Sequence, residues 1–94
     1  MISLIYVVKV IPLPGKHLLC KYIDGKWNLF DARPLLAKSV FAPLEADELF
    51  NKVEVSNGAV SWDNERIDIA PEYMYENGSP ISDESAEIIK CIYG

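Results

Sequence analysis

The 94-residue sequence contains few of the residues that build metal sites, disulfide frameworks or membrane spans. Its two cysteines, Cys20 and Cys91, lie too far apart for a metal-ligand spacing and are too few for a disulfide framework, so we expect two free thiols. His17 is the single histidine, which gives a zinc site or a histidine-based triad little support. No apolar run reaches the roughly 18 residues that cross a bilayer, and the start lacks the features of a signal peptide. These absences predict a cytoplasmic protein with no membrane association, no metal and no cofactor.

Positive charge is also scarce, and it is unevenly placed along the chain. The formal net charge is −5; residues 1–44 carry six Lys or Arg against two Asp or Glu, whereas residues 45–94 carry three against twelve. Nonspecific nucleic-acid binding needs a basic surface that displaces counterions from phosphates, so we expect no direct nucleic-acid binding. The acidic balance suits a basic protein partner.

The first third of the sequence predicts antiparallel strands. Residues 3–11 are apolar on both sides of a period-two pattern, which indicates a central strand. The "PLPG" segment at 12–15 should end it, and residues 16–23 should form the second strand. Asp24-Gly25 predicts a hairpin with a type I′ turn, followed by a third strand over 26–31.

The middle of the sequence combines short helices with a second strand group. We expect one helical turn over residues 32–39 and a two-turn helix near 46–51. Three strands follow in the segment 52–70, with a type I′ turn at Asn57-Gly58. Their alternation places a common set of side chains in the core: Val53, Val55, Val60, Trp62, Ile67 and Ile69.

The end of the chain predicts two helices. Pro71 should begin a helical turn that Asn77-Gly78 ends, and Ser82 should cap a closing helix. That helix carries one apolar stripe, formed by Ala86, Ile89, Ile92 and Tyr93. The fold class is therefore α+β: an antiparallel sheet of about six strands in two meanders, with short helices between them and a C-terminal helix. We expect a single domain over residues 1–80, with a helical extension over residues 81–94 packed on it.

The segment "FDARPLL" at 30–36 is the first candidate for a site with a chemical role. Asp31 and Arg33 could form an acid/base or anion-binding pair. The alternative is structural: Asp31 accepts a backbone hydrogen bond from the turn that follows, and Pro34 suits a first helical turn because its missing N–H needs no partner. We favour the structural role for Asp31, Arg33 and Pro34.

Other polar clusters give weaker signals. Asp63, Glu65 and Asp68 suggest a divalent cation, but the glycine and distal glutamate of a calcium loop do not follow them. The glycines are scattered over turns, so no phosphate-binding loop is present. Without a convincing nucleophile or base, we do not expect an enzyme; Asp31/Arg33 or the carboxylates at 63–68 would have to supply any catalysis.

Aromatic residues favour an interaction role. They make up 11% of a short chain, more than a small sheet buries completely. Exposed tyrosine or tryptophan is typical of a partner-binding patch. The candidates for partner contact are Trp62, Tyr73 and Tyr75.

Three pieces of the sequence together resemble one family, domain of unknown function 2442. They are "DGKWNLFD" after the opening strands, "LFDARPLL" with "VFAPL", and "VEVSNGAVSWDNERIDIAPEYMYENG"; the likeness spans roughly residues 5–79. The family has no assigned reaction, and the resemblance implies a short member encoded beside another small protein, the two interpreted as a toxin–antitoxin pair. Some longer members continue into a helix-turn-helix domain, for which about fifteen residues are too few.

These observations lead to two function hypotheses. The first is a non-catalytic, antitoxin-like interaction module that binds and masks a small protein partner from the adjacent gene. The alternative is a small-molecule sensor or an accessory subunit of an enzyme, with a pocket near Trp27, Phe30 and Tyr75. Open sheet edges also allow a homo-oligomer.

Overall fold

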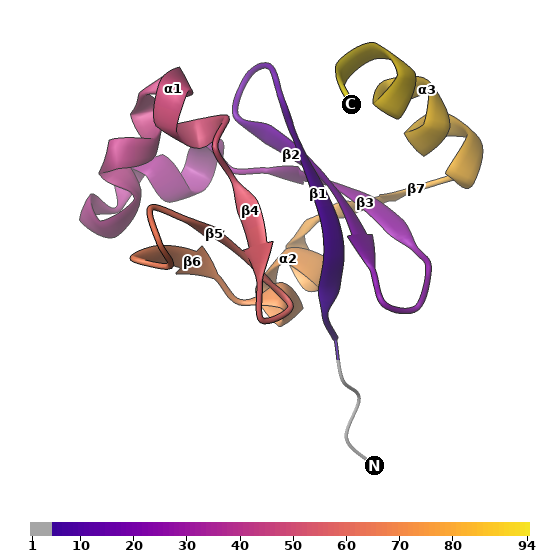
Figure 1. Cartoon of the computed structure of the whole chain (residues 1–94), viewed down its shortest axis with the longest axis horizontal. Coiled ribbons are helices and arrows are strands. Elements are labelled where there is room, and N and C mark those ends of the chain that lie inside the picture. Colours follow the sequence, from indigo (N-terminus) through magenta and orange to yellow (C-terminus); the bar gives the residue numbers. More distant parts are fainter. Residues whose placement is uncertain (1–4) are drawn as a thin grey trace.

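The computed structural model describes residues 5–94 and has the expected α+β architecture (Figure 1). Within those residues the strands form two antiparallel sheets, one ordered β1-β2-β3-β7 and the other β4-β5-β6. In chain order the elements, with η for 3₁₀ helices, are β1 (Val7–Leu13), β2 (His17–Tyr22), β3 (Trp27–Asp31), η1 (Arg33–Ala37), η2 (Ser39–Glu45), α1 (Asp47–Phe50), β4 (Glu54–Ser56), β5 (Ala59–Trp62), β6 (Ile67–Ile69), α2 (Pro71–Asn77), β7 (Ser79–Ile81) and α3 (Asp83–Tyr93).

The opening strand has a different place from the one predicted. β2 and β3, not β1, are the inner strands of the larger sheet, and Leu18, Leu19 and Cys20 of β2 are all fully buried. β1 is an outer strand with Val8 51% exposed, and it continues through Pro12, where we expected a break. A proline fits an outer strand, because its missing N–H can face away from the neighbouring strand.

The two sheets meet at the start of β1. A bulge lies between Val7 and Lys9, and the Val7 amide donates to the Gly58 carbonyl at 2.8 Å. The apolar pattern on both sides of the strand has two sources: Val7 and Val10 pack in the core beside the second sheet, and Ile11 and Leu13 pack on the opposite face toward α3. The pattern alone does not distinguish such an outer strand from a central one. The predicted start of this strand at residues 3 and 4 lies outside the described residues.

β7 was not predicted. It is three residues long, contains Pro80, and pairs with β3 through Ile81 and Trp27. Three residues give no measurable alternation, and a proline argues against a strand except at the edge of a sheet. The edge is where β7 lies.

Two hairpin turns differ in type. Asn57 and Gly58 both have positive φ, 52° and 78°, and join β4 to β5 in the predicted two-residue turn. After β2 only Gly25 is left-handed, with φ 85°, and Tyr22 and Lys26 close a three-residue loop through a 2.9 Å backbone bond. The hairpin was predicted correctly, but its type I′ turn was wrong.

The helices between the strand groups are shorter and tighter than predicted. η1 begins at Arg33 as expected, but the unpredicted η2 fills residues 39–45 and contains Pro43. The predicted helix near 46–51 is only the four-residue α1. A proline inside a segment removes a backbone donor and favours a short, tight turn over a regular α-helix.

The main core lies between the two sheets and the short helices. Its fully buried side chains include Trp62, Tyr22, Phe50, Leu18, Leu44 and Met74. A buried polar link crosses it: the Tyr22 hydroxyl donates to Asn28 Oδ1 at 3.1 Å, and Asn28 Nδ2 donates to the Met74 carbonyl at 3.0 Å. This link ties α2 to the four-stranded sheet.

A second, smaller core lies on the other face of the four-stranded sheet. Ile11, Leu19 and Trp27 meet Ala86 there, and Ala86 is 1% exposed. Ser82 caps α3 as predicted, accepting the Ser85 amide at 3.1 Å. Of the predicted stripe, Ala86 and Ile89 pack on the sheet, but Ile92 and Tyr93 are exposed. The division into a domain over 1–80 and an extension over 81–94 stays a prediction.

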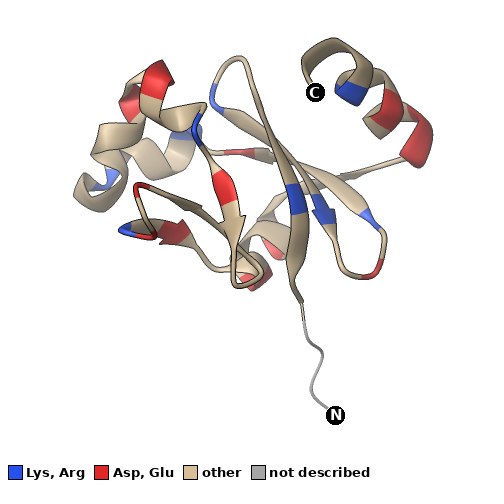
Figure 2. Cartoon of the chain, viewed as in Figure 1, with Lys and Arg blue, Asp and Glu red and all other residues tan. Residues whose placement is uncertain are grey.

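The uneven charge of the sequence becomes an uneven charge in space. In the first sheet the basic residues lie on β1, on β2 and in the turns that flank β2, whereas acidic residues are spread over α1, the second sheet, α2 and the start of α3 (Figure 2). The separation arises because each half of the chain builds its own sheet, apart from β7.

Candidate functional site

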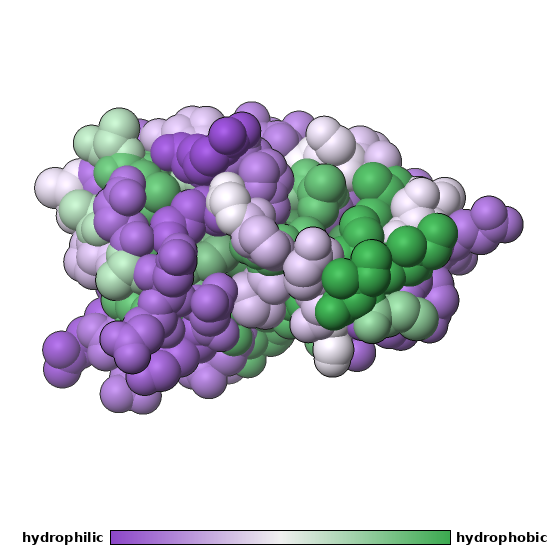
Figure 3. Space-filling view, turned by 90° about the horizontal axis from the view of Figure 1, so that it is seen from above, coloured by the Kyte–Doolittle hydropathy of each residue, from purple (hydrophilic) through white to green (hydrophobic). Residues whose placement is uncertain are grey.

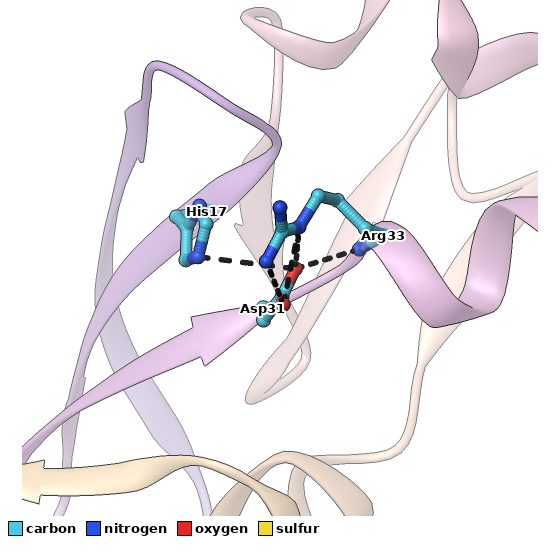
Figure 4. A network of polar contacts seen from close by, with 3 residues as sticks. All are labelled: His17, Asp31 and Arg33. Carbon is cyan, nitrogen blue, oxygen red and sulfur yellow. Dashed lines mark hydrogen bonds and ion pairs between the residues drawn. The ribbon is translucent and has the colours of Figure 1, made fainter.

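The Asp31–Arg33 pair forms a compact ionic contact at the end of β3 (Figure 4). The Arg33 side chain donates to both carboxylate oxygens, from Nη2 to Oδ2 at 2.8 Å and from Nε to Oδ1 at 3.0 Å. The Arg33 amide also donates to Asp31 Oδ1 at 3.0 Å, which is the predicted turn contact. Pro34 follows in the first turn of η1.

His17 completes this polar cluster from the neighbouring strand. It lies opposite Asp31 in the β2–β3 register, with its Nε2 3.8 Å from Asp31 Oδ1. Hydrogen bonds from Arg33 lower the pKa of Asp31 to about 2. A carboxylate held this way is a poor base at neutral pH, because it stays ionised and already accepts three strong donors. The guanidinium is 64% exposed and points along the surface.

No other group of chemistry-bearing side chains converges in the described part of the chain. Residues 5–94 contain no group of three His, Cys, Asp or Glu side chains that could hold a metal ion. No helix among the same residues is long and apolar enough to cross a bilayer. Asp63 and Glu65 lie in the β5–β6 loop, where Glu65 accepts hydrogen bonds from the Ser56 and Asn57 side chains.

The three aromatic candidates for partner contact have separate surroundings. Trp62 is fully buried, and its Nε1 donates to the Phe50 carbonyl at 3.0 Å, so it belongs to the core. Tyr75 is half-buried, with its ring edge against Tyr22 and its hydroxyl donating to Asp24 Oδ2 at 3.1 Å. Tyr73 is 41% exposed. Of these three candidates, Tyr73 offers the largest aromatic surface to a partner.

Tyr73 lines a shallow apolar hollow, which we call the β6 groove. The hollow has a volume of about 220 Å³ and lies between the 3₁₀ helices and the β6–α2 junction. The Tyr73 ring stands edge-on to the buried Phe30, 6.1 Å between centroids, which fixes its position. The residues that line the groove are Leu35, Lys38, Phe41, Asp68, Ile69, Ala70 and Tyr73.

The groove adjoins the outer edge of β6. Apart from its pairing with β5, the backbone of Ile67–Ile69 makes no hydrogen bond to any described residue. The outer strands of the larger sheet carry protective features: β1 has a bulge, Lys9 and Pro12, and β7 has Pro80. β6, with the sequence Ile-Asp-Ile, has no bulge, lysine or proline, and its protection is limited to its short length and the charge of Asp68. It is therefore an open edge that ends beside an apolar hollow.

Sequence reasoning identified Tyr73 but missed the other walls of the groove. Leu35 and Ile69 were assigned to a helical turn and a strand, and Phe41 lies in the unpredicted η2. No local pattern brings them together, because residues 35–41 meet residues 68–73 only through the tertiary fold. The one available signal for this wall of the groove was the Phe–Pro-Leu segment at residues 41–44, and it contributed only to the family resemblance.

Comparisons with known proteins give one match. A family model described as "Protein of unknown function (DUF2442)" matches residues 7–80. No curated protein and no solved structure matches the chain. The matched segment begins with β1 and includes the β6 groove, whereas α3 lies beyond it.

Proposed function

We propose that this chain, which belongs to the family of domain of unknown function 2442, is a non-catalytic interaction module that binds and masks a small cytoplasmic protein, as an antitoxin does. The family has no assigned activity that could be inferred for this chain. The observation that supports the proposal is the β6 groove, in which an open strand edge, an apolar hollow and an exposed tyrosine lie together.

The geometry suits a partner that adds an extended segment to β6. Main-chain hydrogen bonds to the open edge would supply affinity, and a side chain in the hollow would supply specificity. About 220 Å³ is below the 300–1,000 Å³ usual for small-molecule pockets, but it has room for one bulky apolar side chain. Tyr73 would cover one side of that inserted side chain.

The acidic second half of the chain favours a basic partner, while the groove itself is lined by one charge of each sign, Lys38 and Asp68. Asp68 is exposed in the middle of β6, and Glu72 is exposed in the first turn of α2. The second half of the chain carries twelve carboxylates against three cations. Such a field speeds the approach of a basic protein and disfavours acidic ones.

A small-molecule site at the predicted place, near Trp27, Phe30 and Tyr75, receives less support. The hollow that contains Trp27 and Tyr75 has a volume of about 130 Å³, and Phe30 does not line it. A site of that size is too small for most metabolites. In the polar cluster of His17, Asp31 and Arg33, the carboxylate is not a free base, because Arg33 occupies it.

Co-expression tests the proposal. The chain would be produced together with the product of the adjacent open reading frame, and both growth and co-purification would be measured. We expect a stable complex and relief of any growth inhibition that the neighbour causes alone. If the two proteins purify separately and growth is unaffected, the antitoxin role is wrong.

A further inference from the structure

The open edge of β6 carries one charge, and it lies at the centre of the strand. Ile67 and Ile69 are buried in the main core, whereas Asp68 between them is exposed. Asp68 shares its face of the second sheet with Ser61 and Glu54, its neighbours across the strands. No ion pair in the described part of the chain involves Asp68, so its carboxylate is free to meet a charge from outside.

Two cations lie near Asp68 without pairing with it. Arg66 is exposed and directly precedes β6, and Lys38 lies in the wall of the β6 groove that the 3₁₀ helices form. Neither side chain forms an ion pair with the Asp68 carboxylate. The centre of the β6 edge therefore presents an uncompensated negative charge to an added strand.

The broadest apolar surface of the molecule lies away from β6. In Figure 3 hydrophobic residues gather at the end that carries α3, whereas the opposite end, with the short helices, combines hydrophilic residues with smaller hydrophobic areas. Figure 1 places β6 at the end with the short helices. A partner at β6 therefore depends on the hollow, on main-chain hydrogen bonds and on charge, and not on a wide apolar contact.

Strand addition determines which partner side chain meets Asp68. Side chains alternate between the two faces along a strand, and residues opposite each other in neighbouring strands share a face. A partner residue opposite Asp68 therefore lies beside its carboxylate. The residues before and after it point to the other face, where Ile69 lines the hollow. An opposite charge beside Asp68 stabilises the pairing, and a like charge destabilises it.

A second copy of the chain presents the wrong charge to β6. The strand is three residues long, so two copies paired antiparallel over its full length would place Asp68 opposite Asp68. Like charges directly opposite each other are destabilising, and charged side chains on edge strands are a known protection against pairing between identical chains. Asp68 therefore disfavours self-association at an edge that is otherwise open.

We propose that Asp68 determines the specificity of the β6 edge. It selects a partner strand that has Lys or Arg opposite it and an apolar residue on each side of that cation, and it rejects a second copy of this chain. One of the apolar residues fills the hollow, while the cation neutralises the carboxylate. The inference rests on the proposed function, because it takes the β6 groove as the site of the partner, and it adds the sequence pattern that the partner carries there.

Two capped peptides, Thr-Phe-Lys-Phe-Thr and Thr-Phe-Glu-Phe-Thr, test the selection in titrations of the full chain followed by its backbone amide signals in NMR. We expect the lysine peptide to shift the signals of residues 67–69 and to bind roughly threefold or more tightly than the glutamate peptide. The order of the two peptides should reverse in Asp68→Lys.

Glu54→Lys is the matched control for this titration. Glu54 is exposed on the same face of the same sheet, but it lies on β4, which is next to β1 and not at the open edge. It is two strand spacings from Asp68, roughly 10 Å, where salt screens most of its charge. The preference for the lysine peptide should persist in this variant.

The outcomes separate this inference from the proposed function. If neither peptide shifts the signals of residues 67–69, β6 does not accept a strand and both proposals are wrong. If both peptides bind at β6 with equal affinity, or if the lysine peptide is still preferred by Asp68→Lys, the groove remains a binding site but Asp68 does not determine its specificity.

Sedimentation equilibrium tests the rejection of a second copy. Asp68→Thr removes the repulsion, so its dissociation constant for self-association should be roughly threefold or more below that of the native chain. Glu54→Thr removes the same charge from the same face and should leave the constant unchanged. Equal constants for the native chain and Asp68→Thr, or equal effects of the two substitutions, would overturn this role of Asp68.

Discussion

Gly78 lies so close to Asn28 that a single added carbon would overlap it. A Cβ atom placed on Gly78 would be 2.4 Å from Asn28 Nδ2 and 2.8 Å from the Met74 carbonyl oxygen. The φ of Gly78 is an ordinary −85°, so the glycine is required by space and not by backbone conformation. The two residues hold α2 against β3 through the buried amide of Asn28.

Gly78→Ala should therefore lower the free energy of unfolding by about 1–3 kcal/mol, the usual cost of overpacking a core. Urea denaturation measures the change. In Asn28→Ala one of the two obstructing groups is absent, so adding Gly78→Ala to that variant should cost less, and the remaining cost comes from the Met74 carbonyl. Strictly additive effects of the two substitutions would show that they do not act through this contact.

Trp62→Phe should also destabilise the fold, by about 1–3 kcal/mol. The change removes the hydrogen bond from Nε1 to the Phe50 carbonyl and leaves a cavity in the main core. Trp27→Phe is the control, because the Trp27 indole donates no hydrogen bond to the described residues. Chemical denaturation should show a larger loss of unfolding free energy for Trp62→Phe than for Trp27→Phe. Equal losses would show that the hydrogen bond does not stabilise the fold.

Asp31 should stabilise the protein at neutral pH and lose this effect in acid. Its pKa is about 2 in the folded chain and 3.8 ordinarily, so the unfolded state binds the proton more readily. The contribution is complete above about pH 4 and decreases as the pH falls toward 2. The melting temperature of Asp31→Asn should be below that of the native sequence at pH 6, with the difference shrinking by pH 2. If the difference in melting temperature were as large at pH 2 as at pH 6, ionisation of Asp31 would not be its cause.

The two cysteines should differ sharply in reactivity. Burial raises the pKa of the Cys20 thiol to about 12, and its side chain is fully enclosed, whereas Cys91 is exposed. A colorimetric thiol reagent at pH 8 should titrate one thiol per folded chain and two after denaturation. Two rapidly reacting thiols in the folded protein would show that β2 is not a central strand.

The sequence allowed the fold class and most elements to be predicted, since they depend on local signals. Asn57-Gly58 determined a two-residue hairpin, Ser82 determined a helix start, and alternation identified the strands β4, β5 and β6. That these strands form a sheet of their own was not predicted. The errors concern the placement of elements. The pattern of β1 looks alike whether the strand is central or meets a second sheet, and β7 is too short to give a pattern.

The polar and aromatic candidates also divide into those that local signals predict and those that depend on the tertiary fold. The turn role of Asp31 and Arg33 was predictable, because their contact spans only two residues. Alternation also placed Trp62 in the core, which is confirmed. The surroundings of Tyr73 were not predictable, because the β6 groove forms with Leu35 and Phe41, which are distant in sequence. Periodicity assigns a face to a side chain, but it does not say what covers that face.

The affinity of the complex with the adjacent gene product tests the central claim most directly. Tyr73→Ala removes the exposed wall of the β6 groove, and Tyr6→Ala is the matched control, since the two tyrosines are 41% and 39% exposed. Calorimetry should show at least a tenfold loss of affinity for Tyr73→Ala, about 1.4 kcal/mol or more, and less than a twofold change for Tyr6→Ala. Equal affinities for both variants would show that the partner does not bind at the β6 groove.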